Sequence, residues 1–165
     1  MSDEPASKPQ IRLPPPGAAF LLSQLGFESA RRWAERIAPL GIEPRQGLVL
    51  RVLNNVGPTT QADLARRIRV PASKVVGLVD ELEAAGLAER RSVQGDRRVR
   101  AIHLTDLGAQ TLGELAKASA AHEKELTAGL SAAERRQLVE LLEGVADELG
   151  LTRGIHPGVG AGRRR

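Results

Sequence analysis

The sequence predicts a mainly helical fold that carries one small β-hairpin, and three observations lead to this prediction. Several long segments repeat apolar residues at the three- and four-residue spacing of a helix. Residues 87–104 instead contain two short strand-like runs around a glycine turn. Of the 165 residues, 41% are hydrophobic but only 2% are aromatic, so the core must be built from aliphatic side chains. Such a core suits closely packed helices.

The chain begins with a polar, proline-rich stretch, residues 1–16, which we expect to be a disordered arm. Residues 18–38 are predicted to form a long helix, because apolar residues cover a broad face of it. Prolines and glycines then interrupt the pattern. A second helix is predicted from Pro44 to about Asn55, since proline is well tolerated at a helix start. Its expected inward residues are Leu48, Val49, Val52 and Leu53.

A pair of short helices follows. The first runs from Gln61 to about Arg69, with the hydroxyl of Thr59 or Thr60 as its N-terminal cap. Pro71 forces a turn, because the residue before a proline disfavours helical geometry. The second helix is predicted from Ala72 to Ala85, and Gly86 is a natural stop. Its apolar face, expected to pack on the first helix, consists of Val75, Leu78, Val79 and Leu82.

The strand-like runs, 87–91 and 100–104, predict a β-hairpin with its turn at 94–96. Residues 90–100 contain five arginines and one aspartate. A hairpin tip this basic suits contact with phosphates or insertion into a DNA minor groove. The alternative is a solvated hairpin with scattered charge. Because the hairpin follows a helix pair of this spacing, we interpret the whole as a winged helix-turn-helix, a shape that docks on duplex DNA.

Two further helices are predicted after the hairpin. Thr105 can cap the first, which reaches about Leu126, and Ser131 with Glu134 forms a capping box that opens the second. The first carries a heptad-like seam of Gly108, Leu112, Leu115, Ser119, His122 and Leu126. The second carries an apolar stripe of Leu138, Leu141, Leu142, Val145 and Leu149. We interpret these two helices, together with the helix at 18–38, as a dimerisation lobe, because a small domain does not need three long amphipathic helices beside a DNA-binding core. The alternative is that they complete a monomer core. Residues 151–165 are expected to be a disordered basic tail.

Residues 20–150 resemble the MarR family of bacterial transcription regulators. The resemblance is carried by QADLARRI, by the pattern SKVxxLVDELExxGL, by GDRRxR, and by LTxxG at Leu104, Thr105 and Gly108. It implies a MarR-like domain over 17–150, with the winged helix-turn-helix at 58–108 and dimerisation helices at 17–40 and 105–150. It also implies an obligate homodimer in which the second helix of the pair reads the major groove of double-stranded DNA and the hairpin contacts the minor groove.

The residues expected to bind DNA lie at the start of each helix of the pair and on the hairpin. They are Thr60, Gln61, Ser73, Lys74, Val76, Gly77, Arg91, Asp96, Arg97 and Arg98. The resemblance assigns the hairpin contact to Asp96, Arg97 and Arg98, with the aspartate holding an arginine in position. Val76 and Gly77 depart from the family pattern of small polar and then basic residues. Glycine in a helix costs roughly 1 kcal/mol against alanine, while Val76 can touch a thymine methyl group.

The resemblance also implies small, often anionic aromatic effectors bound between the dimerisation and DNA-binding lobes. The candidate effector-binding residues are Arg31, Trp33 and His122. Both Trp33 and His122 have a simpler interpretation as packing residues.

Several classes of function are not expected. The three histidines lack metal-ligand spacing, and no nucleophile motif or glycine-rich phosphate loop is present, so we expect no metal, no cofactor and no enzymatic activity. Cysteine is absent, which excludes disulfides and thiol sensing. No apolar run reaches membrane-spanning length and the start is not that of a signal peptide, so we expect a cytoplasmic protein with no membrane partner.

The sequence therefore predicts a ligand-responsive dimeric regulator, with repression favoured over activation, that binds a palindromic operator. The alternative is an architectural or protein-interaction module with little sequence preference, which Val76 and Gly77 favour slightly.

Overall fold

A computed structural model describes residues 15–93, 96–152 and 154–156, with side chains for all of these except 96–98. Most of the described chain is helical and its strands form one small antiparallel sheet, which confirms the predicted fold class. In chain order the elements are α1 (Ala18–Ile37), η1 (Ala38–Leu40), α2 (Pro44–Val56), β1 (Thr59–Thr60), α3 (Gln61–Ile68), α4 (Ala72–Ala84), β2 (Ala88–Val93), β3 (Asp96–Leu104), α5 (Asp106–Leu126) and α6 (Ala132–Glu148).

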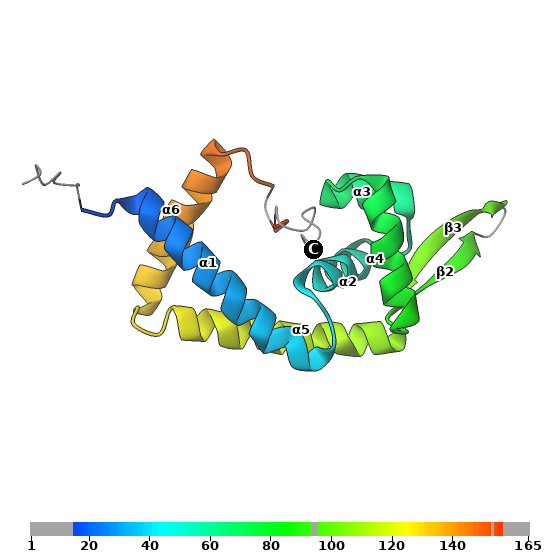
Figure 1. Cartoon of the computed structure of the whole chain (residues 1–165), viewed down its shortest axis with the longest axis horizontal. Coiled ribbons are helices and arrows are strands. Elements are labelled where there is room, and N and C mark those ends of the chain that lie inside the picture. Colours follow the sequence, from blue (N-terminus) through cyan, green and yellow to red (C-terminus); the bar gives the residue numbers. More distant parts are fainter. Residues whose placement is uncertain (1–14, 94–95, 153, 157–165) are drawn as a thin grey trace, which may run out of the picture.

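The molecule is elongated, and helix α5 runs along one side of it (Figure 1). At its start α5 lies near α4 and the β2–β3 hairpin, and at its end it lies near α6 (Figure 1). The one long helix therefore joins the part that carries the helix pair and hairpin to the part that carries α1 and α6.

The hydrophobic core lies where α2, α3, α4 and β3 meet. Residues predicted to face inward on α4 are all buried, as are Leu48, Val49 and Leu53 of α2, whereas Val52 is half-buried. Leu50, which the sequence pattern did not assign to the core, is fully buried. The largest fully buried side chains are Ile37, Leu50, Leu53, Leu64, Ile68, Leu82, Ile102, Val49, Val75 and Val79.

The hairpin is longer than predicted, and it belongs to a three-stranded sheet. Strand β2 continues to Val93, which pairs with Asp96 at the start of β3, and the pairing is irregular between Ser92 and Val93. The two-residue strand β1 pairs with β3 through Thr59 opposite Ile102. Threonines are common in strands, but two residues are too few to show a period, so the sequence did not reveal β1.

A tight corner joins α4, the hairpin and α5. Gly86 has φ of +70° and ends α4, with its N–H bonded to the Glu83 carbonyl and that of Leu87 bonded to the Leu82 carbonyl. The Thr105 hydroxyl donates to the Gly86 carbonyl at 2.7 Å and accepts from the Gly108 N–H at 3.0 Å. The corner thus fixes the direction in which α5 leaves the hairpin.

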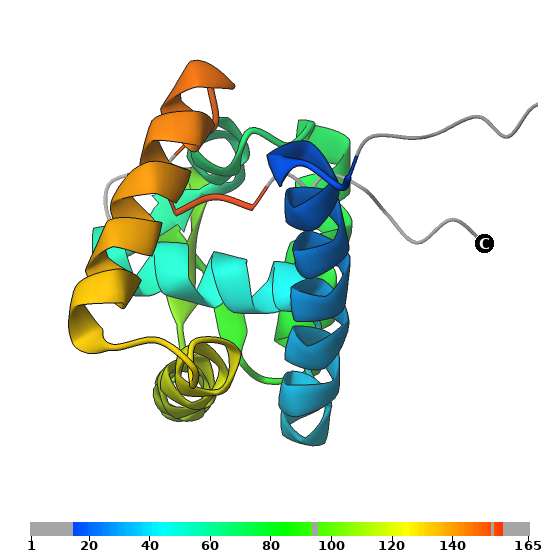
Figure 2. The ribbon, with the colours of Figure 1, turned by 90° about the vertical axis from the view of Figure 1, so that its left-hand side faces the viewer.

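Helices α1 and α6 have few buried residues. Ile37 is the one buried residue of α1, and no residue of α6 is buried. Figure 2 shows the two helices standing apart from each other on either side of the molecule. The apolar stripe predicted on α6 is confirmed as a feature of the helix surface, but within the chain it faces outward.

The chain continues past the predicted end of the folded domain at residue 150. Residues 154–156 return to α2, where Ile155 is half-buried against the core and Arg51 donates to the carbonyl of Gly154. The described contacts with α2 therefore include residues of the predicted tail. The rest of the predicted tail and residues 1–14 of the predicted arm lie outside the described residues.

Candidate DNA-binding surface

The outer face of α4 near its first turn is exposed because its opposite face is anchored in the core. Val75, Leu78 and Val79 are buried, so the residues on the opposite side of this part of the helix must point away from the core. The predicted contact residues Ser73, Lys74, Val76 and Gly77 are all exposed, and 44% of Val76 is accessible. A Cβ added at Gly77 would meet nothing within 4 Å, so this part of the helix presents bare backbone outward.

The start of α3 is held by local hydrogen bonds. The Thr60 hydroxyl accepts from the Asp63 N–H at 3.1 Å and donates to the Asp63 carboxylate at 2.7 Å. This bond from Thr60 and the ion pair with Arg66 hold the pKa of Asp63 below its usual range. Thr60 is thus the cap, as one of two predicted alternatives, and its hydroxyl is engaged within the fold. Gln61 is half-buried, and its side-chain nitrogen has no partner among the described residues.

The end of α3 adds cations that the sequence-based list left out. Arg66, Arg67 and Arg69 are all exposed there, and Arg69 lies in the turn that connects α3 to α4. Arg69 has φ of +54° and is the one non-glycine residue with positive φ in the described chain. This left-handed geometry costs an L-residue roughly 1–2 kcal/mol. The run RRIR, directly before the predicted turn, was the signal in the sequence that pointed to these residues.

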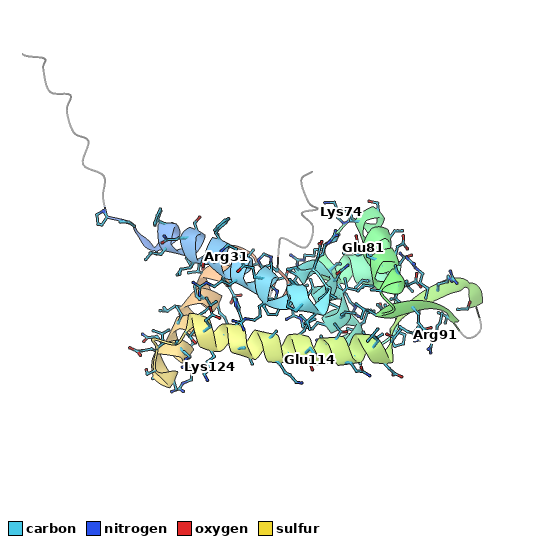
Figure 3. The ribbon with its side chains drawn as sticks, turned by 60° about the horizontal axis from the view of Figure 1, so that its bottom comes forward. Arg31, Lys74, Glu81, Arg91, Glu114 and Lys124 are labelled. Carbon is cyan, nitrogen blue, oxygen red and sulfur yellow. The ribbon has the colours of Figure 1, made fainter. Side chains whose placement is uncertain are left out.

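The hairpin is less basic than its arginine count suggests. Arg90 is nearly buried and forms ion pairs with Asp80, at 2.7 Å, and with Glu83 of α4. It therefore fastens the hairpin to α4 and does not face DNA. Arg91 pairs with Glu89 but keeps 61% of its side chain exposed. Lys74 and Arg91 both belong to the part of the molecule that carries the hairpin (Figure 3). The side chains of the predicted residues Asp96, Arg97 and Arg98 lie outside the described ones.

Two of the three candidate effector-binding residues come together. Trp33 of α1 and His122 of α5 have ring centroids 5.6 Å apart at an interplanar angle of 53°. The Nε2 atom of His122 lies 3.1 Å from the Ser29 hydroxyl, and its Nδ1 atom is buried without a partner among the described residues. Ser29 is a member of this cluster that the sequence did not single out, because its proximity to His122 depends on how α1 packs against α5.

The third candidate, Arg31, does not join this cluster. Its guanidinium pairs with Glu28 at 2.7 Å and with Glu35 at 2.6 Å, both on its own helix. The hydrogen bond from Arg31, followed by that from Arg32, lowers the pKa of Glu28 from 4.5 to about 2. Arg31 and Trp33 point in different directions, because side chains two residues apart on a helix do not face each other.

Two classes of site are absent from the part of the chain that the structure describes. It contains no group of three or more histidine, cysteine or acidic residues that could hold a metal ion. It also contains no helix with the length and apolar character needed to span a bilayer.

Comparison with known proteins gives the family. The model of the MarR family matches residues 40–99. A protein of Thauera aromatica, named as a transcriptional regulatory protein for the hcr operon, is 34% identical over 131 residues, covering 74% of this chain and 79% of that protein. The transcriptional repressor CouR, solved bound to a 23-mer DNA duplex, has a TM-score of 0.69 and 28% identity, covering 78% of this chain and 92% of that chain. CouR from Rhodococcus jostii RHA1, solved with p-coumaroyl-CoA, has a TM-score of 0.63 and 27% identity, covering 78% and 90%.

These findings confirm the resemblance to the MarR family that the sequence motifs indicated. MarR proteins are transcription regulators and not enzymes, which agrees with the expectation that this chain has no catalytic activity. The exposed face of α4 and the winged helix architecture are the parts expected of a DNA-binding member. The chain belongs to the MarR family of DNA-binding transcription regulators.

Proposed function

We propose that the protein is a homodimeric repressor that binds a palindromic operator and leaves it when a small aromatic, anionic effector binds. The observation that carries the proposal is the division of the chain into two unpartnered surfaces. One is the exposed, partly basic surface formed by α3, α4 and the hairpin. The other consists of the exposed apolar faces of α1 and α6.

These apolar faces support dimerisation. On α6, Leu141 is 63% exposed and Leu149 is 69% exposed, and on α1 Phe27 is 75% exposed. Burial of apolar surface contributes about 25 cal/mol per Å². Packing of these residues against a second copy of the chain would therefore stabilise a dimer. A closed twofold dimer would present two copies of α4, which suits a palindrome.

In the proposed complex α4 enters the major groove by its exposed first turns. Ser73 and Lys74 can donate hydrogen bonds to base edges or phosphates, and Val76 can contact a thymine methyl group. The hairpin reaches the minor groove, where we assign Asp96, Arg97 and Arg98 the contact that the family resemblance implies. Arg91, in strand β2 of the hairpin, supplies a further cation.

The proposed effector site is the Trp33–His122 cluster, because it lies between α1 and α5, where the two parts of the molecule are joined. The indole and imidazole rings offer stacking, and the unpartnered Nδ1 offers a hydrogen bond to a carboxylate or thioester oxygen. CouR, a relative, binds p-coumaroyl-CoA. Trp33 is the one tryptophan of the sequence, so its fluorescence reports binding directly.

Titration with p-coumaroyl-CoA and a panel of aromatic carboxylates tests the effector site. A ligand that changes Trp33 emission should also release the protein from its operator, and His122→Ala should weaken both effects together. A ligand that releases DNA without changing the emission, and that still acts on His122→Ala, would place the effector site elsewhere.

Footprinting on the DNA flanking the gene tests the operator. We expect protection of an inverted repeat. The second candidate function is an architectural module with little sequence choice, and it is favoured by the bare backbone at Gly77. That module would protect duplexes of any sequence equally.

A further inference from the structure

The turn between α3 and α4 contains a residue, Arg69, in a backbone conformation that residues with a Cβ atom rarely adopt. Arg69 has φ of +54°, a region where glycine is free of the clash that a Cβ makes with the backbone. The turn itself requires this geometry, because it brings the Val70 N–H to the Ala65 carbonyl at 3.1 Å. Glycine would meet the requirement without strain.

The fold makes no use of the Arg69 side chain. It is exposed, and it forms no hydrogen bond or ion pair with any described residue. Two other arginines of this region differ in this respect, since Arg66 pairs with Asp63 and Arg90 pairs with Asp80 and Glu83. Arg67 also pairs with no described residue, but it lies in regular helix and carries no backbone strain. A guanidinium that is held in a strained turn and has no partner inside the chain points to a partner outside it.

The position of the turn identifies the chemistry of that partner. Arg69 lies three residues before the start of α4. It is therefore next to the N-terminal end of α4, which presents Ser73 and Lys74. Arg66 and Arg67 are exposed on the preceding turn of α3. A helix that enters the major groove with this end brings its preceding turn close to the DNA backbone that borders the groove.

We infer that Arg69 binds a backbone phosphate of duplex DNA and anchors the turn before α4 on the sugar–phosphate chain, at the expense of the stability of the turn. The inference rests on DNA binding through α4. It adds to the predicted contacts a positioning residue that carries affinity but no sequence information.

An alternative role for the cation lies within the protein. A positive charge near the C-terminal end of α3 interacts favourably with the helix dipole. The two roles predict opposite effects on stability. Replacing Arg69 by glycine should stabilise the fold if the side chain serves DNA, and should destabilise it if the charge serves the helix.

The experiment compares Arg69→Gly with Arg69→Lys, which keeps the charge and the backbone strain, and with Lys117→Gln, which removes one charge on α5 away from the turn. Each is measured for thermal unfolding and for binding to two 30-bp duplexes, the operator fragment and one of arbitrary sequence, across a salt series. Because a phosphate contact is independent of sequence, the arbitrary duplex tests Arg69 even if no operator exists.

For Arg69→Gly we expect a melting temperature higher by about 2–4 °C and binding to both duplexes weaker by about tenfold. The slope of log K against log salt should become shallower by about 0.9 for each copy of Arg69 that is lost. Arg69→Lys and Lys117→Gln should bind like the parent protein. If Arg69→Gly fails to fold, Arg69→Asn, which tolerates the left-handed region, takes its place.

Arg69→Gly with the parental affinity and salt slope on both duplexes would overturn the inference, as would a loss of stability with unchanged binding. A parent protein that binds neither duplex would overturn the inference together with the proposed function. A parent that binds both duplexes equally would overturn only the operator proposal, and the salt slopes would still decide the role of Arg69.

Discussion

Gly108, the last residue of the LTxxG motif, is required by the corner between the hairpin and α5. A Cβ at Gly108 would lie 2.1 Å from the Leu87 carbonyl oxygen and 2.8 Å from a methyl of Leu104. The same carbonyl accepts from the Thr105 N–H at 3.2 Å, so it cannot move without breaking the corner. The motif thus describes a close approach of two backbone segments and not a contact with DNA.

We predict that Gly108→Ala destabilises the protein by about 1–3 kcal/mol, the usual cost of overpacking a tight site. Gly113 is the matched control on the same helix, because a Cβ there meets nothing within 4 Å. Gly113→Ala should stabilise by up to about 1 kcal/mol through helix propensity. Urea unfolding of both variants measures the difference, and equal midpoints would contradict the close approach at Gly108.

Gly77 presents the opposite case, a glycine in a helix where alanine would fit. It costs α4 roughly 1 kcal/mol, and no side chain among the described residues fills the space beside it. Residues that break a local rule without a structural reason are expected at functional sites. We therefore expect the space to be used by DNA that approaches the bare backbone.

Gly77→Ala should raise stability by about 1 kcal/mol and weaken binding to the operator. Unfolding in urea and fluorescence-anisotropy titration measure the two effects on one sample. An alanine variant that is more stable and binds the operator as tightly as the parent would show that DNA does not come close to this position.

At the scale of elements, α1 and α5 are joined by ion pairs as well as by packing. The Glu125 carboxylate of α5 accepts from Arg32 at 2.6 Å and also pairs with Arg36, both on α1. These bonds, chiefly that from Arg32, lower the pKa of Glu125. Glu28, which also pairs with Arg32, has a pKa of about 2.

A carboxylate with a lowered pKa in the folded state contributes stability that is present above its unfolded value and lost as the pH falls. The protein should therefore lose stability between about pH 4.5 and pH 2, the interval that the shift of Glu28 defines. Glu28→Gln should flatten this part of a curve of melting temperature against pH, and Glu125→Gln should also reduce the loss of stability at acid pH. Because these groups are exposed, 0.5 M salt should reduce the effect. An unchanged curve for Glu125→Gln would contradict the role of the ion pairs.

The helix pair could be predicted from the sequence because its signals are local. A capping threonine, a proline turn, an apolar face and a glycine stop each act within a few residues, and the bounds of α3 and α4 agree with the prediction to within one residue. The length of the hairpin and strand β1 depend on pairing across the chain, which no local pattern reports. The fully buried Leu50 depends likewise on contacts from more than one side of α2.

In the candidate sites, too, local patterns selected single residues, whereas the contacts between them depend on the fold. Trp33 and His122 were each selected separately, and the packing of α1 on α5 brings them together. The same packing reveals Ser29, while the acids of its own helix hold Arg31 elsewhere. Arg90 contributed to the predicted charge of the hairpin, but its pairing with Asp80 and Glu83 is a tertiary contact. Composition reports how many charges a segment has, and only the fold reports which of them face outward.

At the scale of the whole molecule, the exposed stripe of α6 predicts a dimer. Leu142 is 41% exposed in the single chain. Leu142→Glu would place a carboxylate without a partner in the proposed apolar interface, where its burial is unfavourable. We expect light scattering to show a dimer for the parent and a monomer at micromolar concentration for this variant, which should also bind DNA weakly. Leu142→Met, which preserves apolar volume, should remain a dimer. A parent protein of monomer mass would contradict the model.

A twofold dimer also constrains the operator. Two copies of α4 that enter successive major grooves on one face of the duplex require half-sites about 10 bp apart from centre to centre. Insertion of about 5 bp between the half-sites turns the second one to the opposite face, where the partner's helix cannot reach it, whereas insertion of about 10 bp restores the face and only lengthens the span. We expect the first insertion to reduce affinity to that of a single half-site. The second should reduce affinity as well, since the proposed dimer would hold its two copies of α4 at a fixed separation. Anisotropy titrations on the three duplexes separate these outcomes, and affinity that does not change with spacing would mean that the two heads do not read one site together.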